Sequence, residues 1–190
     1  MDKPKFETFD KPKFESLDEP KFETFSVYKF SMNYPPICRV EFNPKTRREG
    51  GDIVFHFPDP DKPRAPTEKV FLSWGALDKA TKKFQTVDEQ AEHSLKAVKK
   101  SSGVKGFEKV AQDTFEINNH KAVYNRIRME EVRGGLFPGR GGGVKREALS
   151  LHLHCEDSSR YFVIYAMLTA NAPEDFGDLF MTMAKSFKCH

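Results

Sequence analysis

Short segments in which apolar and polar residues alternate follow one another from residue 28 to residue 169, and turn-forming residues separate them. In 38–42, Cys38, Val40 and Phe42 alternate with charged residues, and in 147–155 three leucines alternate with Ser and His. Because successive side chains of a strand point to opposite faces, each such segment fits a half-buried strand. The chain is therefore expected to fold mainly as an antiparallel sheet with one face on a core.

The strands expected from this pattern are bounded by Pro, Gly, Asn or Ser. They span 28–35, 38–42, 53–58, 69–75, a hairpin over 107–131, 147–155 and 160–169. Segment 160–169 is apolar on both faces, which predicts a central strand. Asn118 and Asn119 occupy the hairpin turn, where Asn tolerates the positive φ that a tight turn requires.

Two helices are expected. The first spans 86–102, where Thr86 and Glu89 form a capping box and apolar residues follow at helical spacing. The second opens near Asn171 and Pro173 and carries the strongest apolar stripe of the chain. That stripe consists of Phe176, Leu179, Phe180, Met183 and Phe187.

Residues 2–25 repeat one octad three times, as DKPKFETF, DKPKFESL and DEPKFETF. The proline of each copy favours an extended chain. One interpretation is a mobile duplicated tail. The other, which we prefer, is that each PKFETF unit docks along a groove or sheet edge, either its own or a partner's. We place the arm at 1–26 and the folded domain at 27–190.

The charge balance limits the class of partner. There are 31 Lys+Arg and 28 Asp+Glu, a net charge of +3, so a dedicated nucleic-acid binder is not expected. The sequence has no apolar run long enough for a membrane span, and its charged, Pro-broken start does not resemble a signal peptide. The three cysteines are far apart and form no CxxC, so we expect reduced thiols and a cytoplasmic protein.

Several segments together resemble the PsbP/Mog-like superfamily. They are YKFSMNYP, KVFLSWG with the 86–102 helix, DTFEINNHKAVYNRIRME, and RYFVIYAMLTANAPEDF with the closing AKSFK. The resemblance covers residues 28–188. It implies an α+β fold in which helices flank an antiparallel sheet, an α/β/α sandwich. It also implies non-enzymatic binding, adaptor or assembly roles. A thylakoid or lipoprotein targeting segment and an acidic Ran-binding motif have no counterpart in this sequence.

The loop 133–146 is the first candidate site, since six of its fourteen residues are Gly and basic residues surround them. Free backbone N–H groups and guanidinium groups can hold a phosphate or a carboxylate-rich partner. The phosphate-binding pattern GxxxxGK[ST] is absent, so a long mobile hairpin loop is the preferred interpretation. If the loop binds, its contact residues are Arg133, Leu136, Phe137, Arg140, Lys145 and Arg146.

The second candidate is a basic patch on the sheet. Tyr124, Arg126 and Arg128 share a face of their strand, and His152 and His154 share a face of theirs. If the two strands are neighbours, we expect these residues to lie together. The alternative is a solvated face whose charges are paired across strands.

The histidine pair could supply two metal ligands, but a third would have to come from elsewhere, and two solvent-facing histidines are the preferred interpretation. We predict no metal site, no cofactor and no catalytic residue, because no nucleophile–base motif is present. The predicted function is non-enzymatic binding, adaptor or assembly work with a protein partner, through the sheet face, the Gly/Arg loop or the arm. The alternative is a small anionic ligand or metal bound near Arg126, Arg128, His152 and His154, with or without catalysis.

Overall fold

The computed structural model describes residues 21–58, 66–101, 103–132, 143–169 and 172–189. Strands and helices follow one another along this part of the chain. In order they are β1 (Glu23–Val27), β2 (Phe30–Tyr34), β3 (Arg39–Phe42), β4 (Gly51–Pro58), β5 (Pro66–Ala76), α1 (Leu77–Thr81), α2 (Val87–Lys99), β6 (Val104–Ile117), β7 (His120–Val132), β8 (Gly143–Cys155), β9 (Arg160–Leu168), α3 (Phe176–Lys185) and β10 (Lys188–Cys189).

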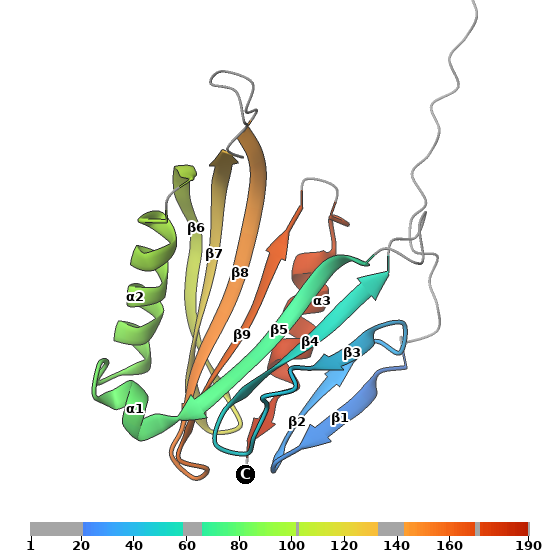
Figure 1. The fold of residues 1–190 in the computed structure, drawn as a ribbon, viewed down its shortest axis with the longest axis vertical. Helices are drawn as coiled ribbons and strands as arrows, with labels where there is room; N and C mark the ends of the chain where they lie inside the picture. The colour runs from blue at the N-terminus through green and yellow to red at the C-terminus, as the bar shows by residue number, and fades with distance from the viewer. Residues whose placement is uncertain (1–20, 59–65, 102, 133–142, 170–171, 190) are drawn as a thin grey trace, which may run out of the picture.

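A seven-stranded sheet is the centre of the molecule (Figure 1). Its strands lie in the order β3-β4-β5-β9-β8-β7-β6, and each neighbouring pair is antiparallel. The strand that is apolar on both faces, β9, lies in the middle of this order, as its sequence predicts. The predicted α+β class with a mainly antiparallel sheet is confirmed.

One face of this sheet, the inner face, carries the main core. The alternate leucines of β8 point to it and are buried, as are the alternate apolar residues of β4. Phe180 of α3 is fully buried in the same cluster. Phe30 of β2 packs edge-on against Trp74 and Phe162, with ring centroids 4.9 and 5.3 Å apart. Each such ring contributes about 1.5–3 kcal/mol by leaving water, so α3 and β2 are fixed on this face.

A second, three-stranded sheet has the order β1-β2-β10, and its strand β1 begins at Glu23, inside the third octad. β1 pairs with β2 over its whole length, and Phe25 packs against Phe55 at a centroid distance of 5.8 Å. The predicted boundary between residues 26 and 27 therefore falls inside a strand, and the folded domain begins before it. The end of this copy lies in an edge strand, and docking of the arm as a whole stays a prediction. The first two octads lie outside the described residues.

The opposite, outer face of the large sheet is covered by α2 over β6, β7 and β8 (Figure 1). The expected capping box is present: the Thr86 hydroxyl accepts a hydrogen bond from the Glu89 N–H at 3.2 Å. The Glu89 carboxylate in turn accepts one from the N–H just before Thr86, at 2.8 Å. Ala91 lies in a buried cluster with Val123 of β7. Helices therefore lie on both faces, which gives the expected α/β/α sandwich.

The local details agree with the sequence at the turn and differ at the helix starts. Asn118 and Asn119 have φ of 51° and 62°, as a tight β6–β7 hairpin requires. α3 begins at Phe176, later than Asn171 and Pro173 suggest, and α1 was not expected because its five residues carry no full stripe. Among the described residues, no helix combines the length and apolarity that a bilayer span needs.

Candidate functional site

The predicted basic patch on β7 and β8 is not formed. The two strands are neighbours, but Arg126 lies opposite a core leucine of β8, whereas His152 lies opposite Val123, beneath α2. Directly paired residues in an antiparallel sheet share a face. Arg126 and Arg128 therefore lie on the inner face, and His152 and His154 lie on the outer face. The sequence misleads here because β7 is apolar on both faces, so alternation alone does not fix which face meets the leucines.

Both arginines are paired with one carboxylate. Their Nε atoms lie 2.6 Å (Arg126) and 3.2 Å (Arg128) from the two oxygens of Glu147. Tyr124, on the same face, is 7% exposed, and its ring packs near Phe180 at 6.3 Å. Burial raises the pKa of the Tyr124 hydroxyl. Tyr124 is thus a core residue, and the interpretation with charges paired across strands fits the two arginines.

The two histidines lie beneath α2, where His152 is buried and His154 is half-buried. His152 is 2% exposed, and its removal from water lowers its pKa to about 4. Burial also lowers the pKa of His154, whose Nε2 lies 2.5 Å from the Gln90 side-chain oxygen of α2. Both rings are therefore neutral near pH 7. The alternative function, an anion or metal held by both arginines and both histidines, loses its geometric basis.

The candidate loop is described in part. Arg133, Leu136, Phe137 and Arg140 lie outside the described residues. Lys145 and Arg146 lie in β8, where Lys145 pairs in register with Glu130 and the Arg146 Nε lies 2.6 Å from a Glu131 oxygen. The basic end of the loop thus faces the acidic end of β7, and binding by the loop stays a prediction.

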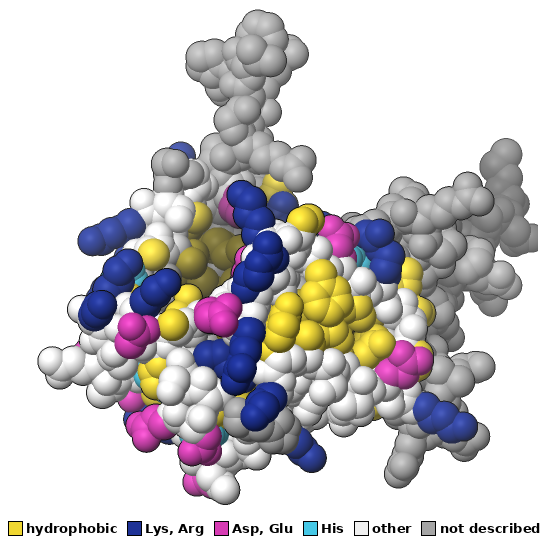
Figure 2. Space-filling view, turned by 60° about the horizontal axis from the view of Figure 1, so that its bottom comes forward, with side chains coloured by type: hydrophobic (Ala, Val, Ile, Leu, Met, Phe, Trp, Pro, Cys, Tyr) yellow, Lys and Arg dark blue, Asp and Glu magenta, His cyan; other side chains and the backbone are white. Residues whose placement is uncertain are grey.

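The outer face of β4, β5 and β9 carries an apolar row that α2 does not cover. Val54, Phe71 and Tyr165 pair directly across these three strands. The rings of Phe71 and Tyr165 are stacked, with centroids 4.7 Å apart and planes 6° from parallel, and Tyr165 is 37% exposed. Figure 2 shows apolar side chains gathered in one area of the surface, with a band of Lys and Arg beside it. We call this row, together with the surrounding residues Glu41, Asn43, Pro44 and Asp52, the open face.

A shallow groove of about 460 Å³ crosses the open face. Its walls are Glu41, Asn43, Pro44, Asp52, Val54, Phe71 and Tyr165. Two of these residues are acidic and none is basic. The Asp52 carboxylate accepts a hydrogen bond from the Ser73 hydroxyl. Burial, and after it the charge of Asp52, raises the pKa of Tyr165. The sequence signal for this site is the apolar outer side of β9. A strand buried on both faces gives the same pattern, so the sequence does not show that this side is open.

Two of the three buried, free cysteines are neighbours. Cys38 is separate from them, and burial raises the pKa of its thiol to about 12. Cys155 of β8 and Cys189 of β10 share a hydrogen bond that lowers the pKa of Cys155 and raises that of Cys189. The three cysteines are far apart in the sequence, and the fold brings two of them, Cys155 and Cys189, together.

No protein-family model matches the sequence, and no curated protein does. Solved structures do match. Cyanobacterial PsbP (CyanoP) from Synechocystis sp. PCC 6803 gives a TM-score of 0.62 at 13% identity, over 96% of this chain and 99% of that one. The Ran-binding protein Mog1p of Saccharomyces cerevisiae gives 0.59 at 12% identity, over 90% and 96% of the two chains. A Pseudomonas aeruginosa protein described as a putative regulator gives 0.53 at 10% identity, over 87% and 94%.

The chain therefore has the PsbP/Mog-like fold, and the resemblance drawn from its sequence segments is confirmed at the level of the fold. At these identities the match shows a shared arrangement of strands and helices and does not show a shared function, so the function is argued from the site.

Proposed function

We propose that the protein is a non-enzymatic, cytoplasmic binding or adaptor protein that holds a segment of a protein partner on its open face. The observation that carries this proposal is the stacked pair Phe71 and Tyr165, which lies uncovered beside the part of the same face that α2 buries. Aromatic residues that form a contiguous exposed patch are typical of protein-binding surfaces, where they act as anchors.

The charge of the groove selects the chemistry of the partner. Glu41 and Asp52 line it beside the aromatic pair; Glu41 is already paired with Arg39 at 3.0 Å, whereas Asp52 makes no ion pair with any described residue and leaves the groove a negative charge. A partner that places a Lys or Arg between these carboxylates and an apolar side chain on Phe71 would satisfy both features. Mog1p, which shares this fold, is a Ran-binding protein, so the fold is compatible with protein binding. The Gly/Arg loop and the octad arm are further candidate contacts.

The proposal is tested by affinity capture from native lysate with the full chain and with Tyr165→Glu, which places a charge in the stacked pair of the open face. We expect the captured partner to bind the variant about 30-fold more weakly, which corresponds to about 2 kcal/mol. Val110→Glu is the matched control, because Val110 is also a large exposed hydrophobic residue, 38% exposed, but lies on β6.

The control variant should bind as tightly as the wild type, and thermal unfolding should show that both variants are folded. Equal binding by Tyr165→Glu and the wild type would refute the assignment of the open face. The assignment would also be contradicted by an acidic partner whose binding is lost when Lys or Arg residues of this protein outside the open face are replaced.

A further inference from the structure

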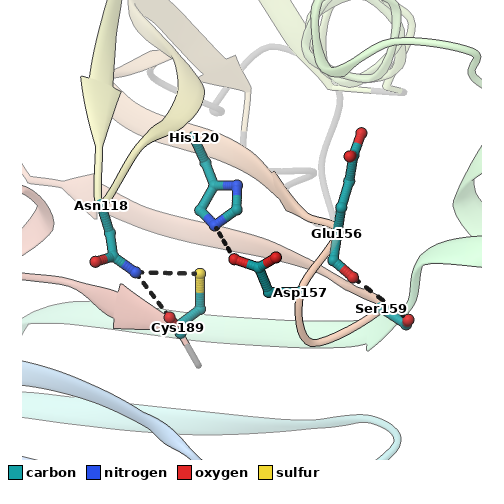
Figure 3. Close-up of polar contacts among 6 residues, drawn as sticks. All are labelled: Asn118, His120, Glu156, Asp157, Ser159 and Cys189. Carbon is teal, nitrogen blue, oxygen red and sulfur yellow. Dashed lines mark hydrogen bonds and ion pairs between the residues drawn. The ribbon is translucent and has the colours of Figure 1, made fainter.

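A histidine and two cysteines from distant parts of the sequence meet at the end of the molecule where the chain ends (Figure 1). Figure 3 shows two of the three, His120 and Cys189. His120 begins β7, Cys155 ends β8, and Cys189 lies in β10. The candidate ligand atoms of these residues lie within 4.8 Å of one another. Cys155 and Cys189 are 0% and 3% exposed, so their thiols face a site with little access to water.

The spacing is close to that of a zinc site. In a tetrahedral site, Zn–S bonds of about 2.3 Å and Zn–N bonds of about 2.0–2.1 Å place the ligand atoms about 3.3–3.8 Å apart. The three ligand atoms therefore have to approach by about 1.5 Å at most, a shift within the reach of side-chain rotation. Thiolate and imidazole ligands favour Zn²⁺ over the hard cations Mg²⁺ and Ca²⁺.

The surroundings of His120 and Cys189 are independent evidence for a ligand. The Nε2 atom of His120 is buried and makes no hydrogen bond to any described residue. A carboxylate oxygen of Asp157 is 3.6 Å from it (Figure 3), and the Asp157 side chain is 78% exposed. The Asn118 side-chain amide donates to the Cys189 carbonyl at 2.7 Å and to its sulfur at 3.8 Å. Such hydrogen bonds commonly orient the ligands of a metal.

We propose that His120, Cys155 and Cys189 bind one Zn²⁺ ion, with the Asp157 carboxylate closing the fourth position. On binding, each thiol releases its proton to solvent, and the two thiolates balance the charge of the ion. The site would join β10, which belongs to the three-stranded sheet, to β7 and β8 of the large sheet. Zinc would thus act as a structural cross-link between the two sheets. This proposal is independent of the open face.

The test is zinc titration of the tag-free full chain, reduced and freed of metal by a chelator, in competition with a chromophoric chelator. We expect one Zn²⁺ per chain. With Co²⁺ in place of Zn²⁺, we expect the near-ultraviolet absorption of thiolate-to-cobalt charge transfer. Cys155→Ser and His120→Asn should each weaken binding by about 100-fold or more, and Asp157→Asn by about 10-fold. Cys38→Ser is the matched control and should bind as the wild type does, because Cys38 is buried outside the cluster.

Circular dichroism shows which variants fold. If Cys155→Ser does not, Asp157→Asn decides, because its exposed side chain can be replaced without disturbing the core. Equal zinc affinity in the wild type, Cys155→Ser and Asp157→Asn would overturn the proposal. So would the absence of charge-transfer absorption in the reduced wild type, or a Cys155–Cys189 disulfide that persists in reductant.

Discussion

Replacement of Phe25 by Ala tests whether the third octad is part of the folded domain. The Phe25 ring contacts three others: its centroid lies 5.8 Å from that of Phe55, 5.5 Å from that of Phe42 and 6.4 Å from that of Phe30. The contact with Phe55 is edge-to-face, at 86°. If β1 were a loosely attached tail, truncation of this ring would leave the free energy of unfolding almost unchanged.

The expected loss follows from the burial of the ring. Truncation of a fully buried Phe to Ala costs about 3–5 kcal/mol, and Phe25 is half-buried, so about 2 kcal/mol is expected. Favourable aromatic pairs, worth about 0.5–1.5 kcal/mol each, are included in that sum. For a chain of this length, each kcal/mol lowers the Tm by about 2–4 °C, so the variant should melt about 4–8 °C below the wild type.

Urea unfolding followed by circular dichroism measures this loss, with the m-value as a check that the same surface is exposed. Val110→Ala is the control, since Val110 is exposed on β6 and its truncation should change the free energy by less than about 0.5 kcal/mol. If Phe25→Ala and Val110→Ala unfold at the same urea concentration, β1 is not packed as described and the assignment of the third octad to the domain is refuted.

Three further perturbations use the same urea assay. Thr86→Ala removes the hydroxyl that caps α2 and should lower the free energy of unfolding by about 1 kcal/mol; an unchanged value would argue against the cap. Glu68→Ala removes the buried carboxylate that accepts hydrogen bonds from the N–H and the hydroxyl of Thr169, and the free energy of unfolding should fall by about 1–3 kcal/mol. An unchanged value would mean that water takes the place of the carboxylate. The pKa of His152 is about 4 in the folded state, so between pH 6.5 and 4 the unfolded state binds a proton that the folded state does not. The free energy of unfolding should therefore fall by about 3 kcal/mol as the pH falls through that window. His152→Gln should make this fall smaller.

Alternation was sufficient to find most strands because inner-face residues are buried along most of β4 and β9 and along the second half of β8. It did not separate β1 from the arm, since the third octad has nearly the same sequence as the first two and a repeat carries no information about which copy is paired. The capping box of α2 was readable because the contact between Thr86 and Glu89 is local.

The predicted basic patch was wrong because it depended on the register between two strands, which the sequence does not give. A shift of one residue in the register of β7 against β8 moves Arg126 to the face of His152, and both faces of β7 are apolar, so burial does not choose between the two registers. The same limit applies to Cys155 and Cys189, which lie far apart in the sequence and meet through the pairing of β10 with β2.

Only part of the open face could be predicted from the sequence. The apolar outer side of β9 was visible, but its partner Phe71 could be assigned to the same row only from the antiparallel pairing of β5 with β9. That the row is uncovered depends on where α2 lies, which is a matter of packing and not of local pattern.

Site-specific photo-crosslinking is the most direct test of the open face as the partner-binding surface. A photoreactive phenylalanine analogue in place of Tyr165 should give a covalent product with the partner, and the same analogue in place of Val110 should give none. A product formed from position 110 and not from position 165 would contradict the account.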